Sequence, residues 1–170
     1  HRRDLWGFYA VGAALAIGFS QMEQAFALFI EMVHREIAPP RSFTEAEALA
    51  TWMGDRAVVE PRPGGKFVIA FDDRVVEGRY VEVEFPRRVV VTWGRHGSVR
   101  LPPGGSTLVV TFEAEGSGTR VTIVHEGLPD LERELHARGW AHYLPRLASA
   151  AAGRQLEPHY VPPQLVEGAD

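Results

Sequence analysis

The sequence predicts an α+β fold, in which an antiparallel sheet packs against a long C-terminal helix and a further helix lies at the N-terminus. A series of short segments between residues 67 and 126 alternates apolar with polar side chains, which is typical of antiparallel strands joined by short loops. Residues 130–152 carry an apolar stripe at helical spacing. With 170 residues, 45% of them hydrophobic, the chain is long enough to bury a core without disulfides or structural metals.

Composition excludes several classes of protein. The chain has no cysteine, which rules out disulfide scaffolds, thiolate metal sites and cysteine nucleophiles. The net charge is −4 and the basic residues are dispersed along the sequence, a pattern that does not fit nucleic-acid binding. The histidines do not occur at the spacings of metal-binding pairs. We therefore expect no metal, no cofactor and no nucleic-acid partner.

The N-terminal segment, residues 1–31, supports three interpretations. Residues 5–19 are uncharged and mostly apolar, and they follow two arginines. Apolar residues at three- and four-residue steps predict a packed helix over 5–31. The features of residues 1–27 also fit a signal peptide, or a membrane anchor that is short for a bilayer. With the packed helix, which we prefer, the protein is expected in the cytoplasm.

Residues 32–157 are predicted to form the main domain. A short strand is expected at 32–37, before a proline pair that cannot continue a ladder of strand hydrogen bonds. A helix is expected over 43–53, because residues 42–45 match a capping box and Gly54 suits the helix end.

A sheet is expected to follow this helix. Its predicted strands are 67–71, 74–85, 87–94, 106–114 and 119–126. Gly78 is a candidate β-bulge in the second of them. Alternation in the same strand places Val81, Val83 and Phe85 on the face that packs against the core. The later strands alternate in the same way, so one face of the sheet must be covered by a helix.

The long helix expected after the sheet runs over 130–152. Asp130 is its expected N-cap, Gly153 suits its end, and Pro145 is expected to kink or break it. Its apolar stripe consists of His136, Trp140, Tyr143, Leu144 and Leu147. This stripe is expected to lie across the apolar face of the sheet. Residues 158–170 are expected to form an irregular, proline-containing tail.

Short motifs keep a fixed order through this domain. They include Ala38-Pro39-Pro40, Thr44, Trp52-x-Gly54, Pro63-Gly64-Gly65, Phe67, Gly78, Pro86-Arg87-Arg88-Val89, Thr92-Trp93-Gly94, Gly118-Thr119, His125-x-Gly127-Leu128-Pro129 and Gly139-Trp140-x-x-Tyr143-Leu144. In this order they resemble the helix-grip fold of the START-like SRPBCC superfamily, and most of all the branch named for the C-terminal domain of the activator of the heat-shock-protein-90 ATPase. The resemblance covers about residues 33–157 and implies a curved antiparallel sheet wrapped around the C-terminal helix.

Two features depart from the pattern of that family. The first short helix after the proline pair looks shortened, and the N-terminal segment has no counterpart. We hypothesise that residues 5–31 supply the packing that the shortened helix lacks, either within one chain or across a homodimer.

The resemblance implies a hydrophobic cavity between the sheet and the long helix, and therefore a small apolar or amphipathic molecule as partner. The residues expected to line this cavity are Trp52, Phe67, Phe71, Trp93, Phe112, His125, His136, Trp140 and Tyr143. Ligand pockets typically combine large apolar surfaces with a few polar groups, and His125 is the first candidate for such a group. The simpler alternative is that these side chains fill the core.

Two other functions stay open. An enzyme of the cyclase or hydrolase kind known in the superfamily would use His125 or His136 as an acid–base group, although no catalytic motif surrounds them. A chaperone-associated interaction module is implied only by the family's name, and we rank it last.

Overall fold

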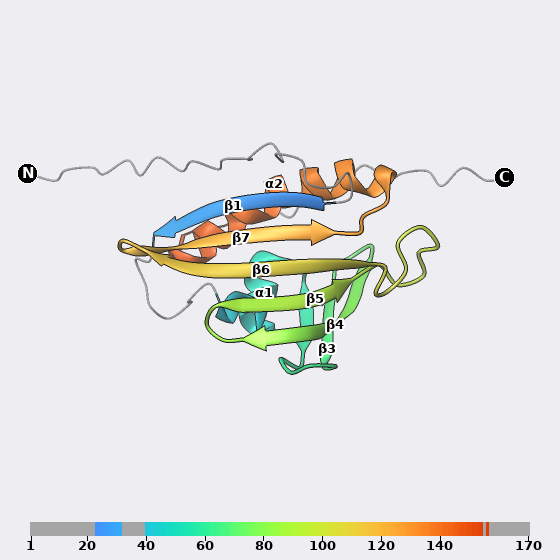
Figure 1. Ribbon diagram of the computed structural model, residues 1–170, viewed down its shortest axis with the longest axis horizontal. Coiled ribbons are helices and arrows are strands. Elements are labelled where there is room, and N and C mark those ends of the chain that lie inside the picture. Colours follow the sequence, from blue (N-terminus) through green and yellow to red (C-terminus); the bar gives the residue numbers. More distant parts are fainter. Residues whose placement is uncertain (1–22, 32–39, 155, 157–170) are drawn as a thin grey trace, which may run out of the picture.

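The computed structural model describes residues 23–31, 40–154 and 156. Its architecture is one seven-stranded antiparallel sheet, curved, with the helices on one face (Figure 1). The strands are β1 (Glu23–Glu31), β2 (Arg56–Val59), β3 (Lys66–Ala70), β4 (Val75–Glu84), β5 (Arg88–Trp93), β6 (Ser106–Glu115) and β7 (Gly118–Glu126), in the order β1-β7-β6-β5-β4-β3-β2. The helical elements are η2 (Arg41–Phe43), α1 (Ala46–Trp52) and α2 (Asp130–Ala151).

This arrangement confirms the predicted fold class, a helix-grip sheet around a C-terminal helix. The predicted strands and the long helix begin and end within one residue of β3 to β7 and α2. They were predictable because each has a strong apolar period and is separated by Gly, Pro and Asp turns. The helix α2 continues through Pro145 to Ala151, so the proline does not break it.

The helix predicted over residues 5–31 is wrong over residues 23–31, which form strand β1. This strand pairs antiparallel with β7 along its whole length, from Glu23 opposite Glu126 to Glu31 opposite Gly118. Without β1, the N–H and C=O groups on that side of β7 would form an unpaired sheet edge, and pairing them outweighs a helical apolar period. Residues 1–22 and the strand predicted at 32–37 lie outside the described residues.

The predicted inward face of β4 is also partly wrong, because the strand contains a bulge at a different place. The pairing with β5 shifts between Tyr80 and Glu82, rather than at Gly78. The extra residue reverses the alternation, so Tyr80 is buried while Val81 is 53% exposed. Phe85, which was also assigned to the core, is 56% exposed beyond the end of the strand.

Local capping differs from the expectation at both helices. The helix predicted over 43–53 divides into η2 and the shorter α1, whose N-cap is Glu45 and makes no side-chain capping bond. At α2 the N-cap is Pro129, and Asp130 is the first helical residue. The sequence prediction missed β2 entirely, since four residues are too few to show a period.

The core lies between the sheet and the helices. Inward residues of β3 to β7 pack there against the buried residues of η2, α1 and α2. Among its largest fully buried side chains are Trp52, Tyr80, Phe43 and Phe67. The core therefore occupies the interface in which a ligand cavity was expected.

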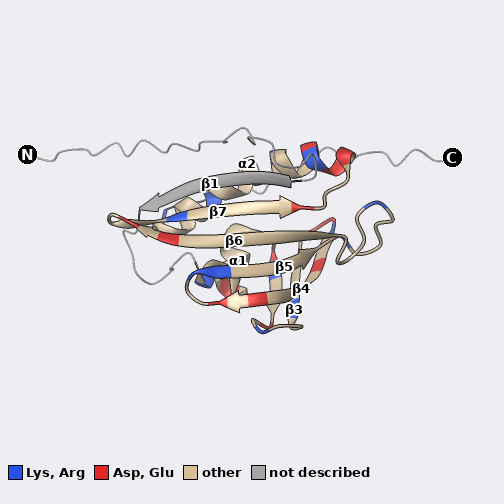
Figure 2. Cartoon of the chain, viewed as in Figure 1, with Lys and Arg blue, Asp and Glu red and all other residues tan. Residues whose placement is uncertain are grey.

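Charged residues do not gather on one element. Figure 2 shows acidic and basic residues spread over strands, turns and both ends of the fold. Within the described part of the chain, no helix is long and apolar enough to cross a membrane.

Candidate functional site

The predicted ligand-binding residues separate into three groups. Most of them are buried, and only Phe71 and His136 are half-buried. The groups are a core set (Trp52, Phe67 and Phe112), a ring cluster (Trp93, His125, His136 and Trp140), and a pair formed by the residue after β3 and by α2 (Phe71 and Tyr143).

The core set makes the contacts of structural residues. The ring of Phe43 lies 5.2 Å from that of Trp52 and 5.7 Å from that of Phe112. The Trp52 indole N–H donates to a backbone carbonyl at 3.1 Å. Phe67 packs edge-on against Tyr80 with 5.5 Å between centroids. A ligand role for this set stays a prediction.

Three elements of the fold supply the ring cluster. Trp93 ends β5, His125 faces inward from β7, and His136 and Trp140 lie one turn apart on α2. The ring centroids are 5.0 Å apart for the two histidines and 5.6 Å apart for the two tryptophans. Strand parity and helical spacing had predicted these residues, and the structure brings them together.

Each nitrogen of the His125 ring has a hydrogen-bond partner. The Trp140 indole N–H donates to Nδ1 at 3.2 Å, and because an indole nitrogen only donates, Nδ1 carries the lone pair. The proton of the neutral ring therefore lies on Nε2, which donates to Ser106 Oγ at 3.0 Å. The Ser106 hydroxyl donates in turn to the carbonyl of Trp93 at 3.1 Å. This chain of bonds ends at the backbone with no unpaired group.

His136 is held in the same way. The Trp93 indole N–H donates to Nε2 at 3.2 Å, so the ring proton lies on Nδ1. Nδ1 donates to the carbonyl of Glu132, one helical turn earlier, at 2.8 Å. Both rings of the cluster are thus fixed in one tautomer by their partners.

Burial keeps both histidines neutral. It lowers the pKa of His125 well below its usual value, and the nearby His136 adds to the effect. Burial also lowers the pKa of His136 to about 4, against the opposing hydrogen bond to Glu132, with Arg95 and Arg74 adding to the decrease. Both nitrogens of each ring are already hydrogen-bonded within the protein.

A buried ion pair lies beside the ring cluster. Glu132, in the first turn of α2, is 1% exposed and lies 2.6 Å from Arg95 and 3.9 Å from Arg100. Its second oxygen is 3.6 Å from His136 Nδ1. The segment after β5, which contains both arginines, is therefore linked to the start of α2 by ion pairs. Periodicity cannot reveal this ion pair, because Glu132 and its arginine partners are distant in the chain.

The second polar location involves Phe71, Arg74 and Tyr143, which we call the Tyr143 group. The ring of Phe71 lies 5.9 Å from that of Tyr143, and the guanidinium carbon of Arg74 lies 4.1 Å from the Phe71 ring centroid. Arg74 Nη1 donates to Asp73 Oδ1 at 2.7 Å, and the Arg74 side chain is 20% exposed. The group joins the turn between β3 and β4 to the middle of α2.

The Tyr143 hydroxyl is buried, and among the described residues it has no hydrogen-bond partner. Burial raises the pKa of Tyr143. The charge of Arg74, hydrogen-bonding interaction with the same guanidinium, and the charge of Arg146 oppose this rise, and Asp73 adds to it. Buried polar groups without a partner are uncommon in native proteins and call for an explanation such as a water, an ion or a ligand. Arg74 was not among the predicted site residues, because a turn arginine carries no periodic signal.

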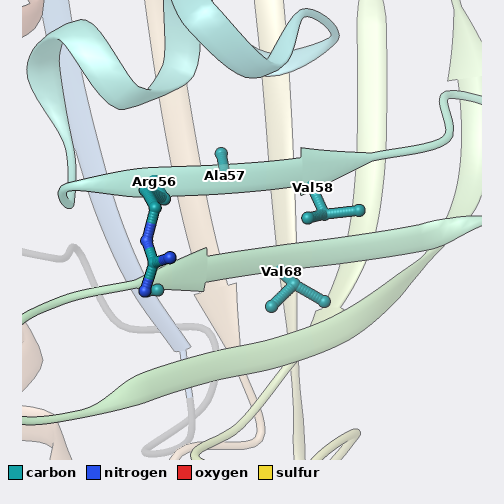
Figure 3. Close-up of a pocket in the computed structure, with 5 residues that line it drawn as sticks. Arg56, Ala57, Val58 and Val68 are labelled. Carbon is teal, nitrogen blue, oxygen red and sulfur yellow. The ribbon is translucent and has the colours of Figure 1, made fainter.

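One surface hollow among the described residues lies away from both of these locations. It is lined by Arg56, Ala57, Val58, Val68 and Ala70 of β2 and β3 (Figure 3). Val68 alternates with the buried Phe67 and Ile69, so the hollow belongs to the outer face of the sheet. None of the predicted ligand-binding residues lines it.

The sequence pattern could have identified some of the site residues that were missed, but not others. Ser106 has the same parity as Leu108 on β6 and faces Trp93 across the strands, so alternation could have identified it. Arg95 and Glu132 are far apart in the sequence and form their ion pair only in the folded chain, so no local pattern identifies them. Among the residues whose side chains are described, no group of three histidines or carboxylates is arranged to hold a metal ion.

Comparisons with known proteins agree with the fold. The family model described as "Activator of Hsp90 ATPase homolog 1-like protein" matches residues 41–152. No curated protein matches the chain. Similar solved structures include the AHSA1-like protein RHE_CH02687 from Rhizobium etli, with 31% identity, a TM-score of 0.62, and coverage of 88% of this chain and 93% of that one.

Two further structures are similar in fold. The Aha1 dimer from Colwellia psychrerythraea is 15% identical, with a TM-score of 0.62 and coverage of 77% of this chain and 96% of that chain. DynU16, from the dynemicin biosynthetic locus, is 17% identical, with a TM-score of 0.66 and coverage of 79% of this chain and 49% of that chain.

Proposed function

The chain belongs to the family of Activator of Hsp90 ATPase homolog 1-like proteins, and from this premise we propose that it binds a small apolar or amphipathic molecule between the sheet and α2. The observation that carries the proposal is the buried Tyr143 hydroxyl, which has no hydrogen-bond partner among the described residues. An unsatisfied buried hydroxyl costs roughly 1–3 kcal/mol, and a ligand oxygen beside it would remove that cost.

The surroundings of this hydroxyl favour entry from one side. Phe71 is half-buried and Arg74 keeps part of its side chain in water, so the Tyr143 group reaches the surface. The ring cluster, in contrast, is closed by its own hydrogen bonds. We therefore place the ligand at the Tyr143 group, where outward movement of Phe71 would admit an apolar tail. The rings of Trp93 and Trp140 would then stay in place.

The histidines do not favour an enzyme over a binding protein. Both rings are neutral, and each nitrogen already has a protein partner. An acid–base role would require one of these bonds to break before a proton could reach a substrate. The binding function needs no such rearrangement.

Native mass spectrometry of the protein purified from its own host would test the proposal. We expect a bound molecule that leaves on denaturation, and calorimetric titration with decanol should refill the site. Phe71→Ala should weaken decanol binding by about tenfold, because the ring supplies apolar contact. The same spectra report the oligomeric state, and they test the alternative of a homodimer through the N-terminal segment.

Phe85→Ala is the matched control, since Phe85 is 56% exposed beyond the far end of β4. It should leave decanol affinity unchanged. A protein that carries no bound molecule and takes up no decanol would contradict the proposal, and so would equal effects of the two alanine variants.

A further inference from the structure

We infer that the molecule bound at the Tyr143 group carries one anionic head, such as a carboxylate, which Arg74 and the Tyr143 hydroxyl bind together. The inference rests on the proposed function and adds the chemical class of the ligand. It starts from the juxtaposition of a buried hydroxyl that makes no hydrogen bond of normal geometry with the described residues and a guanidinium that packs over the neighbouring Phe71 ring.

The local charge around the hydroxyl is positive. Three charged side chains act electrostatically on Tyr143, namely Arg74, Arg146 and Asp73. The two arginines outnumber the single aspartate. Since this location is partly shielded from water, their charges are less screened than at the open surface. An anion is therefore stabilised here more than a neutral group of the same size.

The guanidinium of Arg74 is held in place before any ligand arrives. It lies over the ring of Phe71 at 4.1 Å, and Nη1 donates to Asp73 at 2.7 Å. A guanidinium has five N–H donors in a rigid plane, and the bond to Asp73 uses one of them. Ordering the side chain in advance lowers the entropic cost of binding.

Hydroxyl and guanidinium together match an oxyanion. At neutral pH the Tyr143 hydroxyl is protonated, because its pKa is raised, and it can donate one hydrogen bond. Arg74 supplies the charge, and hydrogen bonds between charged partners are roughly twice as strong as neutral ones. Phe71, which contacts both residues and is half-buried, supplies apolar contact for the carbon chain next to the head group.

Calorimetric titration of the full chain with decanoate and decanol at pH 7 distinguishes binding of an apolar chain from recognition of an anionic head. The two probes share a carbon chain and differ in charge. We expect decanoate to bind at least about tenfold more tightly than decanol. Arg74→Gln should remove this preference by lowering decanoate affinity toward that of decanol, and Arg74→Lys should keep part of it because the charge remains.

Arg87→Gln is the matched control. Arg87 is also a turn arginine flanking β4 and forms an ion pair with Glu84, so its removal changes net charge equally. It should leave decanoate binding unchanged. Circular dichroism would establish that each variant is folded.

Two results would overturn the inference. Equal affinity for decanoate and decanol, or equal losses in Arg74→Gln and Arg87→Gln, would contradict the anionic ligand and leave the proposed function standing. If neither decanoate nor decanol binds, both the anionic ligand and the proposed binding function are contradicted.

Discussion

The ring cluster and the Tyr143 group lie on the same helix, and they differ in how their polar atoms are satisfied. In the ring cluster each indole and imidazole nitrogen has a partner, so the bonds run from Trp140 through His125 to the backbone without a gap. At the Tyr143 group the hydroxyl has no partner among the described residues. Aromatic side chains on adjacent turns of one helix therefore serve different purposes.

Charge and exposure separate the two regions further. The histidines of the ring cluster are kept neutral by burial. The Tyr143 group has a guanidinium at its centre and a half-buried phenylalanine at its edge. A neutral, fully bonded cluster stabilises the fold, whereas an unsatisfied polar group beside a cation is suited to a ligand. Three measurements can sharpen or break this comparison.

The largest effect is expected from removing an indole of the ring cluster. Trp93→Ala should lower the free energy of unfolding by roughly 3–5 kcal/mol, because a buried ring is lost and its hydrogen bond to His136 breaks. Phe71→Ala, at the Tyr143 group, should cost only about 1–2 kcal/mol, since its ring is half-buried. Urea unfolding of both variants gives the two values. Similar losses would show that the two regions do not differ in their contribution to stability.

The second effect is a dependence of stability on pH. The pKa of His136 is about 4 in the folded chain and 6.5 when unperturbed, so the unfolded chain binds a proton that the folded chain excludes. Stability is therefore complete above about pH 6.5 and falls as the pH drops toward about 4, by roughly 3 kcal/mol. Glu132, Arg95, Arg74 and His125 face this ring and set the value.

Urea unfolding between pH 4 and 7 tests this expectation. His136→Gln should flatten the decrease by about the same amount, because the variant no longer has this titrating ring. His96→Gln is the control for replacing a histidine outside the core, since the His96 side chain is 73% exposed. A decrease identical in the wild type and in His136→Gln would contradict a neutral, buried His136.

Local periodicity explains why much of the fold could be predicted. The strands β3 to β7 and α2 have apolar repeats that the tertiary structure reinforces. Residues 23–31 became a strand because β7 offers an edge to pair with, which a periodic pattern cannot reveal. The bulge after Tyr80 reversed one face of β4 for a similar reason, since only pairing with β5 fixes its position.

At the candidate site, too, local sequence patterns predicted some features but not the contacts between distant segments. Alternation and helical spacing identified His125, Trp140 and Tyr143 as inward residues, and all three are buried. They could not show that the Trp140 indole would satisfy His125 while Tyr143 would have no described partner. Arg74 reaches α2 from a turn, so its role depends on contacts between distant segments. Composition and periodicity predict which residues are buried. Which groups form hydrogen bonds with one another can be identified only from the folded structure.

The smallest effect is the most direct test of the comparison, because it uses the same chemical change at two buried tyrosines. The Tyr80 hydroxyl donates to the carbonyl of Phe43 at 2.6 Å, whereas the Tyr143 hydroxyl has no partner among the described residues. Tyr80→Phe should cost about 1–2 kcal/mol, since it leaves a buried carbonyl unpaired. Tyr143→Phe removes only an unsatisfied group, so the ligand-free protein should keep its stability or gain up to about 1 kcal/mol. Urea unfolding of the two variants measures both changes in stability. An equal loss at both positions would mean that the Tyr143 hydroxyl is already hydrogen-bonded within the protein, which would contradict a ligand-binding role for it.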